Sequence, residues 1–318
     1  MENERVALNG DGAVGVMPPA PKRKKRINRE EVAGTLMASI PLIGFLLFGF
    51  LPLVLAFAMA FMELRFFSFV DATWVGLANF KEVVEDPMFW ESVVNTLVLG
   101  SSTLISLVLS LLIAYLLSKN IVGKKTFRMI YFLPYVCSVV AITLMWKYMF
   151  NTNYGIINQI LGRTGENPID WLGDSKYFSW AVIIMSVWSG MGYGIILFTA
   201  ALTGVNQSMV EASKIDGAGA FRTFWSIVFP AISPTSFYLL VMGVIGALQS
   251  FAVTNVLAQS GGPNSDGVTI VFYLYRRVFE YIGKMGVASA SAWILALMIL
   301  VITIIQFILS RRWVSYDQ

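Results

Sequence analysis

Six long apolar segments, separated by polar stretches, dominate the hydropathy pattern of this chain. They cover residues 34–62, 93–117, 127–150, 178–203, 234–258 and 286–310. Each has roughly the 20 residues that an α-helix needs to cross a bilayer, and a helix satisfies its own backbone hydrogen bonds in lipid. The pattern predicts an all-α membrane protein with six transmembrane helices. Pro41 and Pro52 lie inside the first segment and predict a kink there.

Composition supports a membrane protein and excludes several kinds of chemistry. Of the 318 residues, 57% are apolar and 13% are charged, whereas soluble domains are about 25% charged. The chain has no histidine, which excludes histidine-based catalysis, proton relay and metal binding. The single cysteine, Cys137, lies in an apolar run, which predicts a buried packing role. The net charge of +4 comes from basic residues placed where a membrane topology needs them, so it does not indicate nucleic-acid binding.

Charges in the connecting loops predict the orientation, because cytoplasmic loops carry an excess of Lys and Arg. Residues 1–31 are polar and contain the basic run 22–26, so we interpret them as a flexible cytoplasmic tail. The loop over 63–92 holds six acidic and two basic residues and fits the outside. The later loops then alternate between the cytoplasm and the outside, which places both termini in the cytoplasm. Three basic residues of the last outer loop weaken its outside assignment: Arg276, Arg277 and Lys284.

The loop over 204–233 contains the most informative stretch of the chain, residues 211–218, with Pro230 following at a distance. Ser208 and Glu211 fit a capping box, which predicts a helix with Ser208 as its N-cap. Gly217 and Gly219 predict the end of that helix and a tight turn. Pro230 and Pro234 are expected to break the chain before the next membrane helix. Taken singly, Glu211 is explained by capping and Asp216 by the turn.

Taken together with the spacing to Pro230, this stretch resembles the EAA loop of permease subunits in bacterial ABC importers. The matching positions are Glu211, Ala212, Asp216, Gly217, Ala218, Phe224, Ile227 and Pro230. The chain departs from the family pattern at Ser213 and Phe229, where the family has Ala and Leu. Five further stretches resemble the carbohydrate branch of the family, and in particular the maltose-type "F" half of a permease pair: residues 74–80, 132–135, 154–158, 260–263 and 311–316.

The resemblance implies the type I ABC importer permease fold for residues 32–318, with loop 205–230 as the ATPase-coupling element. In that family the loop docks on the ATPase, where Glu211 would face a basic residue. A second homologous permease would complete the pathway. An ABC ATPase dimer would bind ATP and Mg, and a periplasmic or extracellular solute-binding protein would deliver a carbohydrate. This chain would be a non-catalytic, multi-pass subunit of the cytoplasmic (inner) cell membrane, with no cofactor or metal of its own. It contains no Gly-x4-Gly-Lys-Ser/Thr phosphate loop.

Small polar and aromatic residues of the fourth and fifth segments are candidates for the substrate pathway, because sugars offer hydroxyls and apolar CH faces. By the resemblance, the sugar contacts of maltose-type permeases fall on Ser186, Ser189, Gly190, Tyr193, Gln249 and Ser250. Helical spacing gathers Ser186, Ser189 and Tyr193 near one face. The alternative is that these serines and glycines serve close helix packing. Lys147, the one charge within a predicted span, is expected to snorkel to the membrane interface.

Three other functions stay open at this point. A glycerol phosphate permease of the same class would favour basic groups along the pathway. A stand-alone secondary transporter predicts inverted repeats with broken helices at matching positions. A membrane-embedded enzyme needs clustered catalytic groups at membrane depth. The sequence favours the ABC importer of an oligosaccharide or a related carbohydrate.

Overall fold

The computed structural model describes residues 6–8, 14–16, 29–65, 68–119, 123–258, 260–280 and 284–315. The chain divides into two compact units, Met1–Val54 and Leu55–Gln318. In the first unit, β1 (Val6–Leu8) pairs antiparallel with β2 (Val14–Val16). These strands fall within the segment predicted to be a flexible tail, so part of that tail forms regular structure. The basic run 22–26 lies outside the described residues.

The first apolar segment forms a helix with a π-helical interruption. It consists of α1 (Arg29–Phe45), η1 (Leu46–Phe50) and α2 (Leu51–Met59). At the end of η1 the Leu51 amide donates to the Leu46 carbonyl, five residues back, and Pro52 follows directly. Proline has no N–H and its ring crowds the carbonyl four residues earlier. The hydrogen-bond register thus changes next to Pro52, Pro41 lies inside α1, and the kink itself stays a prediction.

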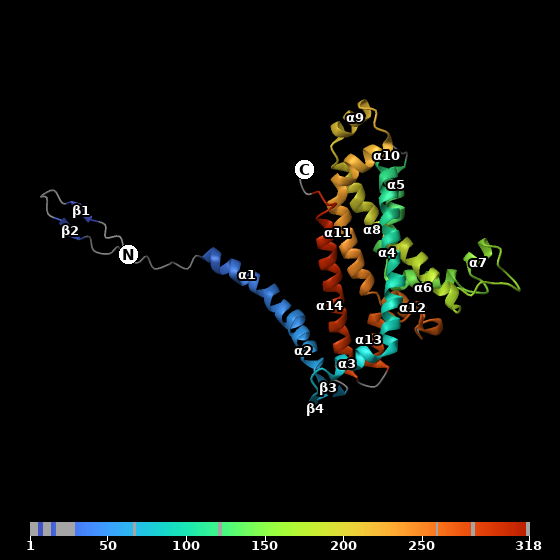
Figure 1. Ribbon diagram of the computed structural model, residues 1–318, viewed down its shortest axis with the longest axis horizontal. Coiled ribbons are helices and arrows are strands. Elements are labelled where there is room, and N and C mark those ends of the chain that lie inside the picture. Colours follow the sequence, from blue (N-terminus) through green and yellow to red (C-terminus); the bar gives the residue numbers. More distant parts are fainter. Residues whose placement is uncertain are drawn as a thin grey trace. The chain divides into compact units, whose positions relative to one another are not determined.

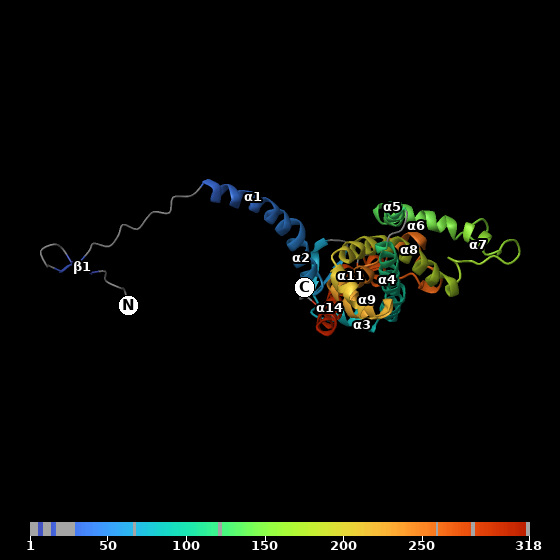
Figure 2. The ribbon, with the colours of Figure 1, turned by 90° about the horizontal axis from the view of Figure 1, so that it is seen from above.

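Four long helices build the second unit and run side by side (Figures 1 and 2). They are α4 (Pro87–Ser118), α8 (Ser175–Thr203), α11 (Phe229–Leu248) and α14 (Met285–Ser310). Helix α4 packs against α8 and α11, and α11 also packs against α8 and α14. Glycines allow some of the close approaches. A Cβ on Gly243 would lie 2.5 Å from the Thr103 Cγ2 atom, so α11 could not approach α4 as closely with a larger residue there.

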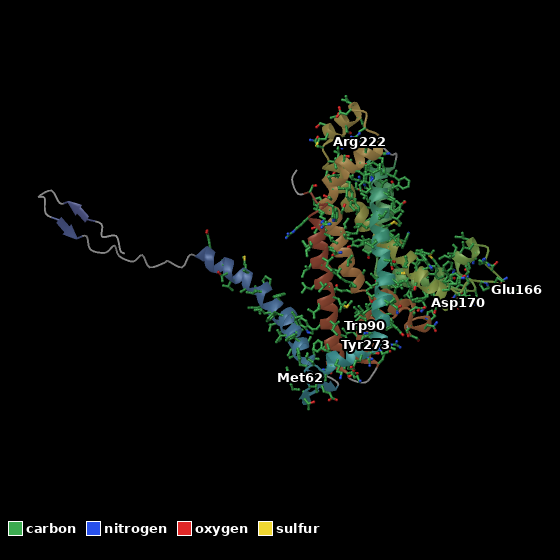
Figure 3. All side chains as sticks on the ribbon, in the orientation of Figure 1. Met62, Trp90, Glu166, Asp170, Arg222 and Tyr273 are labelled. Carbon is green, nitrogen blue, oxygen red and sulfur yellow. The ribbon has the colours of Figure 1, made fainter. Side chains whose placement is uncertain are left out.

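Short elements gather at the two ends of this bundle (Figure 1). One end holds the β3 and β4 hairpin (Met62–Arg65 and Ser68–Trp74), α3 (Ala78–Glu85), α12 (Ala252–Leu257), η3 (Pro263–Ser265) and α13 (Ile270–Phe279). The other end holds α9 (Gln207–Ile215) and α10 (Ala220–Thr223). Figure 3 shows Tyr273 and Trp90 near the first end and Arg222 at the second. The short helix α7 (Ile156–Ile160) lies in the loop between α6 and α8.

The third apolar segment, predicted as one helix over 127–150, is broken. Helices α5 (Lys124–Val136) and α6 (Val139–Met149) are bent by 100° relative to each other. Cys137, at the C-terminal end of α5, has extended backbone geometry, and Pro134 in the last turn of α5 removes a helical N–H donor. Cys137 is exposed in this chain, so the prediction that it is buried is wrong. In the described part of the chain, five helices are long and apolar enough to span a membrane, or six with this bent pair counted as one span.

The fifth apolar segment also differs from the prediction. Residues Ala220–Leu248 form one continuous helical run through α10, η2 (Phe224–Val228) and α11. Pro230 and Pro234 therefore lie within helix α11, and the predicted chain break at these residues is wrong. As at Pro52, a π segment precedes the proline, with the Phe229 amide donating to the Phe224 carbonyl. The helix ends at Leu248 rather than near residue 258, and α12 is separate.

Candidate functional site

A cavity of about 500 Å³ lies between α4, α8 and α11, with one contribution from α5. Hydroxyl groups are the dominant polar groups in its wall. They belong to Ser102, Thr103, Ser106, Ser110, Ser186, Ser250, Tyr135, Tyr193 and Tyr238. Glycines and apolar residues complete the lining. Among the described residues that line the cavity, none is Asp, Glu, Lys or Arg, so its wall carries no formal charge.

Four of the six residues predicted for the pathway line this cavity: Ser186, Gly190, Tyr193 and Ser250. The other two, Ser189 and Gln249, do not. On a helix that turns about 100° per residue, Ser189 lies some 60° away from Ser186, and its hydroxyl donates to the Ser186 carbonyl at 3.3 Å. Gln249 is the C-cap that follows the last residue of α11. Whether any of these side chains contacts a substrate stays a prediction.

Helix α4 supplies a polar stripe that the sequence analysis missed. Ser102, Ser106 and Ser110 recur every four residues and share one face of the helix with Thr103. This four-residue spacing is visible in the sequence of the helix. The predicted pathway residues came from the fourth and fifth segments, and the second segment was interpreted as a plain membrane span. Tyr135 of the third segment and Tyr238 of the fifth were also missed.

The small residues of α8 both pack and line the cavity, so the two alternatives considered for them are compatible. Gly190 and Gly194 face Ser106 and Ser110 of α4: an added Cβ would lie 3.4 Å from the Ser106 Oγ atom and 2.6 Å from the Ser110 Oγ atom. The Ser110 hydroxyl donates to the Met191 carbonyl at 2.9 Å. The close contact of α4 with α8 therefore depends on glycine at the cavity wall.

Three tyrosines from three helices meet in the cavity wall. The rings of Tyr135 (α5) and Tyr193 (α8) are stacked, with centroids 5.0 Å apart and planes inclined by 17°. The hydroxyl of Tyr193 lies 3.2 Å from that of Tyr238 (α11), and either can be the donor. Tyr238 is the cavity-lining residue of α11 that lies closest along the helix to the loop that carries α9. The corresponding residues of α8 are Tyr193 and Gly194. The tyrosine cluster thus marks the end of the cavity that is nearest to that loop.

The predicted coupling loop forms a helix, a turn and a second helix, as expected, but its first helix begins differently. Asn206 is the N-cap of α9, and its side chain accepts a hydrogen bond from the Ser208 amide at 3.0 Å. Ser208 lies inside the helix, and its hydroxyl donates to the Asn206 side chain at 2.6 Å. The predicted capping box of Ser208 and Glu211 is therefore wrong. Asparagine caps at least as well as serine and stands two residues earlier.

The end of α9 matches the prediction. Gly217 has φ +79°, the left-handed conformation that glycine adopts without strain. Its amide donates to the Lys214 carbonyl at 3.1 Å, and the Ala218 amide donates to the Ser213 carbonyl at 2.9 Å. This pair of bonds is the Schellman motif. It turns the chain sharply and leaves Glu211, Asp216 and the 87% exposed side chain of Ile215 on the surface.

At the opposite end of the bundle, a charged cluster joins α4 to α13. Asp86, the N-cap of α4, forms an ion pair with Arg277 and accepts a hydrogen bond from the Tyr273 hydroxyl at 2.7 Å. The Arg277 guanidinium also lies over the Tyr273 ring, 4.9 Å from its centroid. Burial raises the pKa of Tyr273, and its hydrogen bond to Asp86 acts in the same direction. We call Asp86, Tyr273 and Arg277 the α4–α13 clamp.

The three basic residues that weakened the outside assignment of the last loop all have acidic partners. Arg277 pairs with Asp86, Lys284 pairs with Glu82, and Arg276 pairs with Glu280 at 2.7 Å. Their charges are therefore compensated locally and do not form a basic surface. Lys147 is half-buried and its ammonium donates to the Val256 carbonyl at 3.3 Å, while its snorkelling to the membrane interface stays a prediction. It joins the last turn of α6 to the last turn of α12.

Known proteins are similar in sequence to this chain over most of its length. Residues 106–315 match the family described as the binding-protein-dependent transport system inner membrane component. The probable ABC transporter permease protein YesP of Bacillus subtilis is 33% identical over 98% of this chain and 99% of its own length. The arabinooligosaccharides transport system permease protein AraP of Halalkalibacterium halodurans is 30% identical over 92% of each chain. The sn-glycerol-3-phosphate transport system permease protein UgpA of Pectobacterium atrosepticum is 32% identical over 78% of this chain and 84% of its own.

The fold also has a solved counterpart. A chain in the crystal structure of a bacterial ABC transporter involved in the import of the acidic polysaccharide alginate superposes with a TM-score of 0.78. The two chains are 24% identical, and the match covers 89% of this chain and 96% of the other. This likeness supports the expected permease fold. The chain therefore belongs to the binding-protein-dependent transport system inner membrane components, the permease subunits of ABC importers.

Proposed function

We propose that this chain is the transmembrane subunit of an ATP-driven importer that translocates a neutral oligosaccharide. The observation that carries the proposal is the uncharged, hydroxyl-rich cavity between α4, α8 and α11. Hydroxyl groups exchange hydrogen bonds with sugar hydroxyls, and the tyrosine rings offer faces for sugar CH groups. A lining of this kind suits a carbohydrate better than an ion.

The relatives are named for different cargoes, and the cavity favours one of them. AraP is named for arabinooligosaccharides, and UgpA is named for sn-glycerol 3-phosphate, which is an anion. The structural counterpart imports the acidic polysaccharide alginate. A phosphate or carboxylate held in a dry site needs a cationic partner. The described lining residues include no Lys or Arg, which favours a neutral oligosaccharide over an anionic cargo.

The loop from Val205 to Pro230 serves as the coupling element in this proposal. Glu211 is exposed on α9 and Gly217 sets the turn that follows it, so the helix offers its surface to a partner. ATP binding closes the ATPase dimer and moves the docked loop, which rocks α8 and α11 at either end of it. The chain itself performs no chemistry, and ATP and Mg belong to the ATPase.

The remaining partners follow from the family. A second permease completes the pathway, and a solute-binding protein delivers the cargo. The chain resides in the cytoplasmic membrane with both termini and loop 205–230 in the cytoplasm. The test is purification of the tagged chain in mild detergent, followed by mass spectrometry of the co-purifying proteins. We expect a second permease and an ABC ATPase. A homo-oligomer without an ATPase would overturn the proposal and favour a stand-alone transporter.

Reversing the charge of Glu211 provides a sharper test of the coupling loop. Glu211→Lys should reduce recovery of the ATPase and its hydrolysis of ATP by at least tenfold, roughly the cost of one unpaired interfacial charge. Glu166→Lys is the matched control, because Glu166 is equally exposed in the loop between α6 and α8. Recovery of the second permease should be unaffected in both variants. Equal ATPase recovery with Glu211→Lys and with the control would contradict the role of Glu211.

A further inference from the structure

We infer that residues 311–315, which follow α14, form a strap that fastens α14 to the start of α11 and makes both helices follow the coupling loop together. Trp313 and Ser315 of this C-terminal strap contact α11. The contacts themselves are a property of this chain, whereas their role in transport rests on the proposed function. Trp313 is thus a positioning residue for the movement that drives transport.

The chain turns back toward α11 directly after α14. The amides of Trp313 and Val314 both donate to the Ser310 carbonyl, at 3.1 and 2.9 Å. Ser310 is buried, and its hydroxyl donates to the Phe307 carbonyl at 2.9 Å. The strap therefore begins in a hydrogen-bonded turn that is anchored on the last turn of α14.

A proline in α11 provides the polar attachment point of the strap. An amide at position 234 of a regular helix would donate to the carbonyl of Pro230, four residues earlier, but Pro234 has no N–H. The Ser233 hydroxyl donates to that carbonyl instead, at 2.7 Å. The Ser233 oxygen in turn accepts the Ser315 amide at 2.9 Å. The strap is thus bound beside Pro230, the last residue of the predicted coupling motif.

A series of aromatic rings joins the strap to both helices. The Trp313 ring stacks on Phe229 of α11, with centroids 6.2 Å apart, and meets Phe237 edge to face at 6.0 Å. Phe237 meets Phe307 of α14 at 5.0 Å, and Phe229 meets Trp225 of η2 at 4.9 Å. All four distances lie in the range of favourable aromatic pairs. The series therefore runs from η2, next to the loop, through the strap to α14.

The strap connects the coupling loop to a helix that the loop does not lead into. Helix α11 continues the loop through α10 and η2, so it follows the loop directly. Helix α14 runs from the strap to the opposite end of the bundle, where it packs against α13 and α3 (Figure 1). Packed elements transmit a displacement when they move as one body. Through the strap, movement of the loop reaches α14 and, along it, the far end of the second unit.

Two spin labels measure whether α11 and α14 move together, without knowledge of the cargo. Cys137→Ser removes the single native cysteine, and labels are attached at Ser226→Cys in η2 and Leu309→Cys in α14, both of which are exposed. Electron paramagnetic resonance is recorded on the complete complex, with the cysteines of the other subunits replaced, without nucleotide and with ATP and vanadate. With the strap intact, we expect the same distance distribution in both states.

Variants of Trp313 test the aromatic part of the strap. Trp313→Ala should raise the ratio of separated to closed helices by at least about fivefold without nucleotide, because two ring contacts are lost. The distance should then also change when ATP and vanadate are added, since α11 moves and α14 no longer follows. Trp313→Phe keeps a ring at this position and should restore the behaviour of the intact strap.

Ser233→Ala tests the polar part of the strap. It removes the acceptor of the Ser315 amide, so the ratio should rise by about fivefold, the effect of one net hydrogen bond. Ser236→Ala is the matched control, because Ser236 is also buried on α11 and its hydroxyl donates to the Ile232 carbonyl of the same helix at 3.1 Å. This control should leave the distance distribution unchanged in both nucleotide states.

Two results would overturn the strap. One is a distance distribution that Trp313→Ala leaves unchanged. The other is a distribution that widens in Trp313→Ala but does not respond to nucleotide, because residues 311–315 would then stabilise the fold without transmitting movement. Absence of the ATPase from the purified complex would instead count against the proposed function, and the nucleotide-free comparison, which needs no ATPase, would still decide whether Trp313 holds the two helices together.

Discussion

At the scale of single residues, Asp86 makes polar contacts with three residues at its end of the bundle. Its Oδ1 atom accepts from the Met88 amide at 3.0 Å, which caps α4. Its Oδ2 atom serves Tyr273 and Arg277, both of α13. The side chains of Asp86 and Arg277 are only 15% and 16% exposed. Removing the charge of Asp86 therefore leaves a guanidinium in poor contact with water, which is costly.

Asp86→Asn should lower the free energy of unfolding by about 2–3 kcal/mol, because asparagine can still cap α4 but cannot neutralise Arg277. The measurement is the apparent melting temperature of the purified chain in detergent. Glu85→Gln is the matched control. Its ion pair with Lys81 spans 3.8 Å and its side chain is 65% exposed, so we expect a change below about 0.5 kcal/mol. Equal losses in the two variants would contradict the clamp.

The pH dependence of the clamp follows from Tyr273. Burial and the hydrogen bond to Asp86 raise the pKa of Tyr273 above its ordinary value of about 10. A tyrosine whose pKa is raised on folding contributes stability that is fully present below the unfolded pKa and is lost as the pH rises through the folded pKa. The difference between wild type and Asp86→Asn should thus be constant from about pH 6 to pH 9.

The sequence predicted single-residue geometry correctly where one residue type is strongly preferred for one backbone conformation, as glycine is for a tight turn. Gly217 was expected at a tight turn, and its φ of +79° confirms the turn. The prediction failed where two nearby residues can both serve as the N-cap of the same helix. Asn206 and Ser208 are both good caps, and only the path of the chain out of α8 decides between them. The exposure of Cys137 was mispredicted because an apolar run does not reveal that the helix bends there.

At the scale of helices, contacts at glycine set the distances within the bundle. A Cβ on Gly192 of α8 would overlap the Tyr131 carbonyl of α5, which is backbone and cannot rotate away. Gly246 of α11, in contrast, has nothing within 4 Å of the position of an added Cβ. The two glycines lie in long helices that both contribute to the cavity wall, so they form a natural comparison.

Gly192→Ala should destabilise the chain by about 2 kcal/mol or more, because α5 has to move away from α8. Gly246→Ala should leave stability unchanged or raise it by up to about 1 kcal/mol, since alanine is the better helix former. Thermal unfolding of both variants in the same detergent checks the difference. A similar melting temperature for the two variants would show that the α5–α8 contact is not set by Gly192.

Hydropathy predicted the existence of the helices but not their interruptions. Averaging over some 20 residues finds a span, and it does not detect a bend of 100° at residues 137–138 or the end of α11 at Leu248. Pro134, Pro230 and Pro52 were visible in the sequence. Pro134 lies in the last turn of α5, whereas Pro52 and Pro230 each follow a π segment inside a helical run, and the sequence around the three prolines does not distinguish these outcomes.

At the scale of the whole molecule, the two ends of the second unit have different chemistry. One end carries the α4–α13 clamp and three further ion pairs, and the other carries the exposed loop with α9 and α10. The sequence predicted this division from loop charges, with a difficulty at Arg276, Arg277 and Lys284. Arg277 and Lys284 pair with acidic residues far away in the sequence, Asp86 and Glu82, whereas Arg276 pairs with Glu280, four residues further along the chain. A count of charges within the loop does not contain the two distant pairings.

Labelling of single cysteines measures the orientation of the chain. In a Cys137→Ser background, Glu166→Cys should react with a membrane-impermeant maleimide in intact spheroplasts, and Arg222→Cys should react only after permeabilisation. Both residues are exposed, and Figure 3 shows them in different parts of the second unit. Labelling of both after permeabilisation controls for reactivity. The reverse pattern would place loop 205–230 outside the cell and exclude its contact with a cytoplasmic ATPase.

The π segment before Pro230 also has an evolutionary meaning. A helix with one π turn holds one residue more than a regular α-helix of the same length. Phe224–Val228 can therefore be regarded as the trace of a single inserted codon. Every residue on its N-terminal side is turned by about 100° relative to α11 compared with an uninterrupted helix. Deleting one residue there would restore regular α-helix and point α9 in another direction. The direction in which the coupling loop points thus depends on the presence of a single residue in this segment.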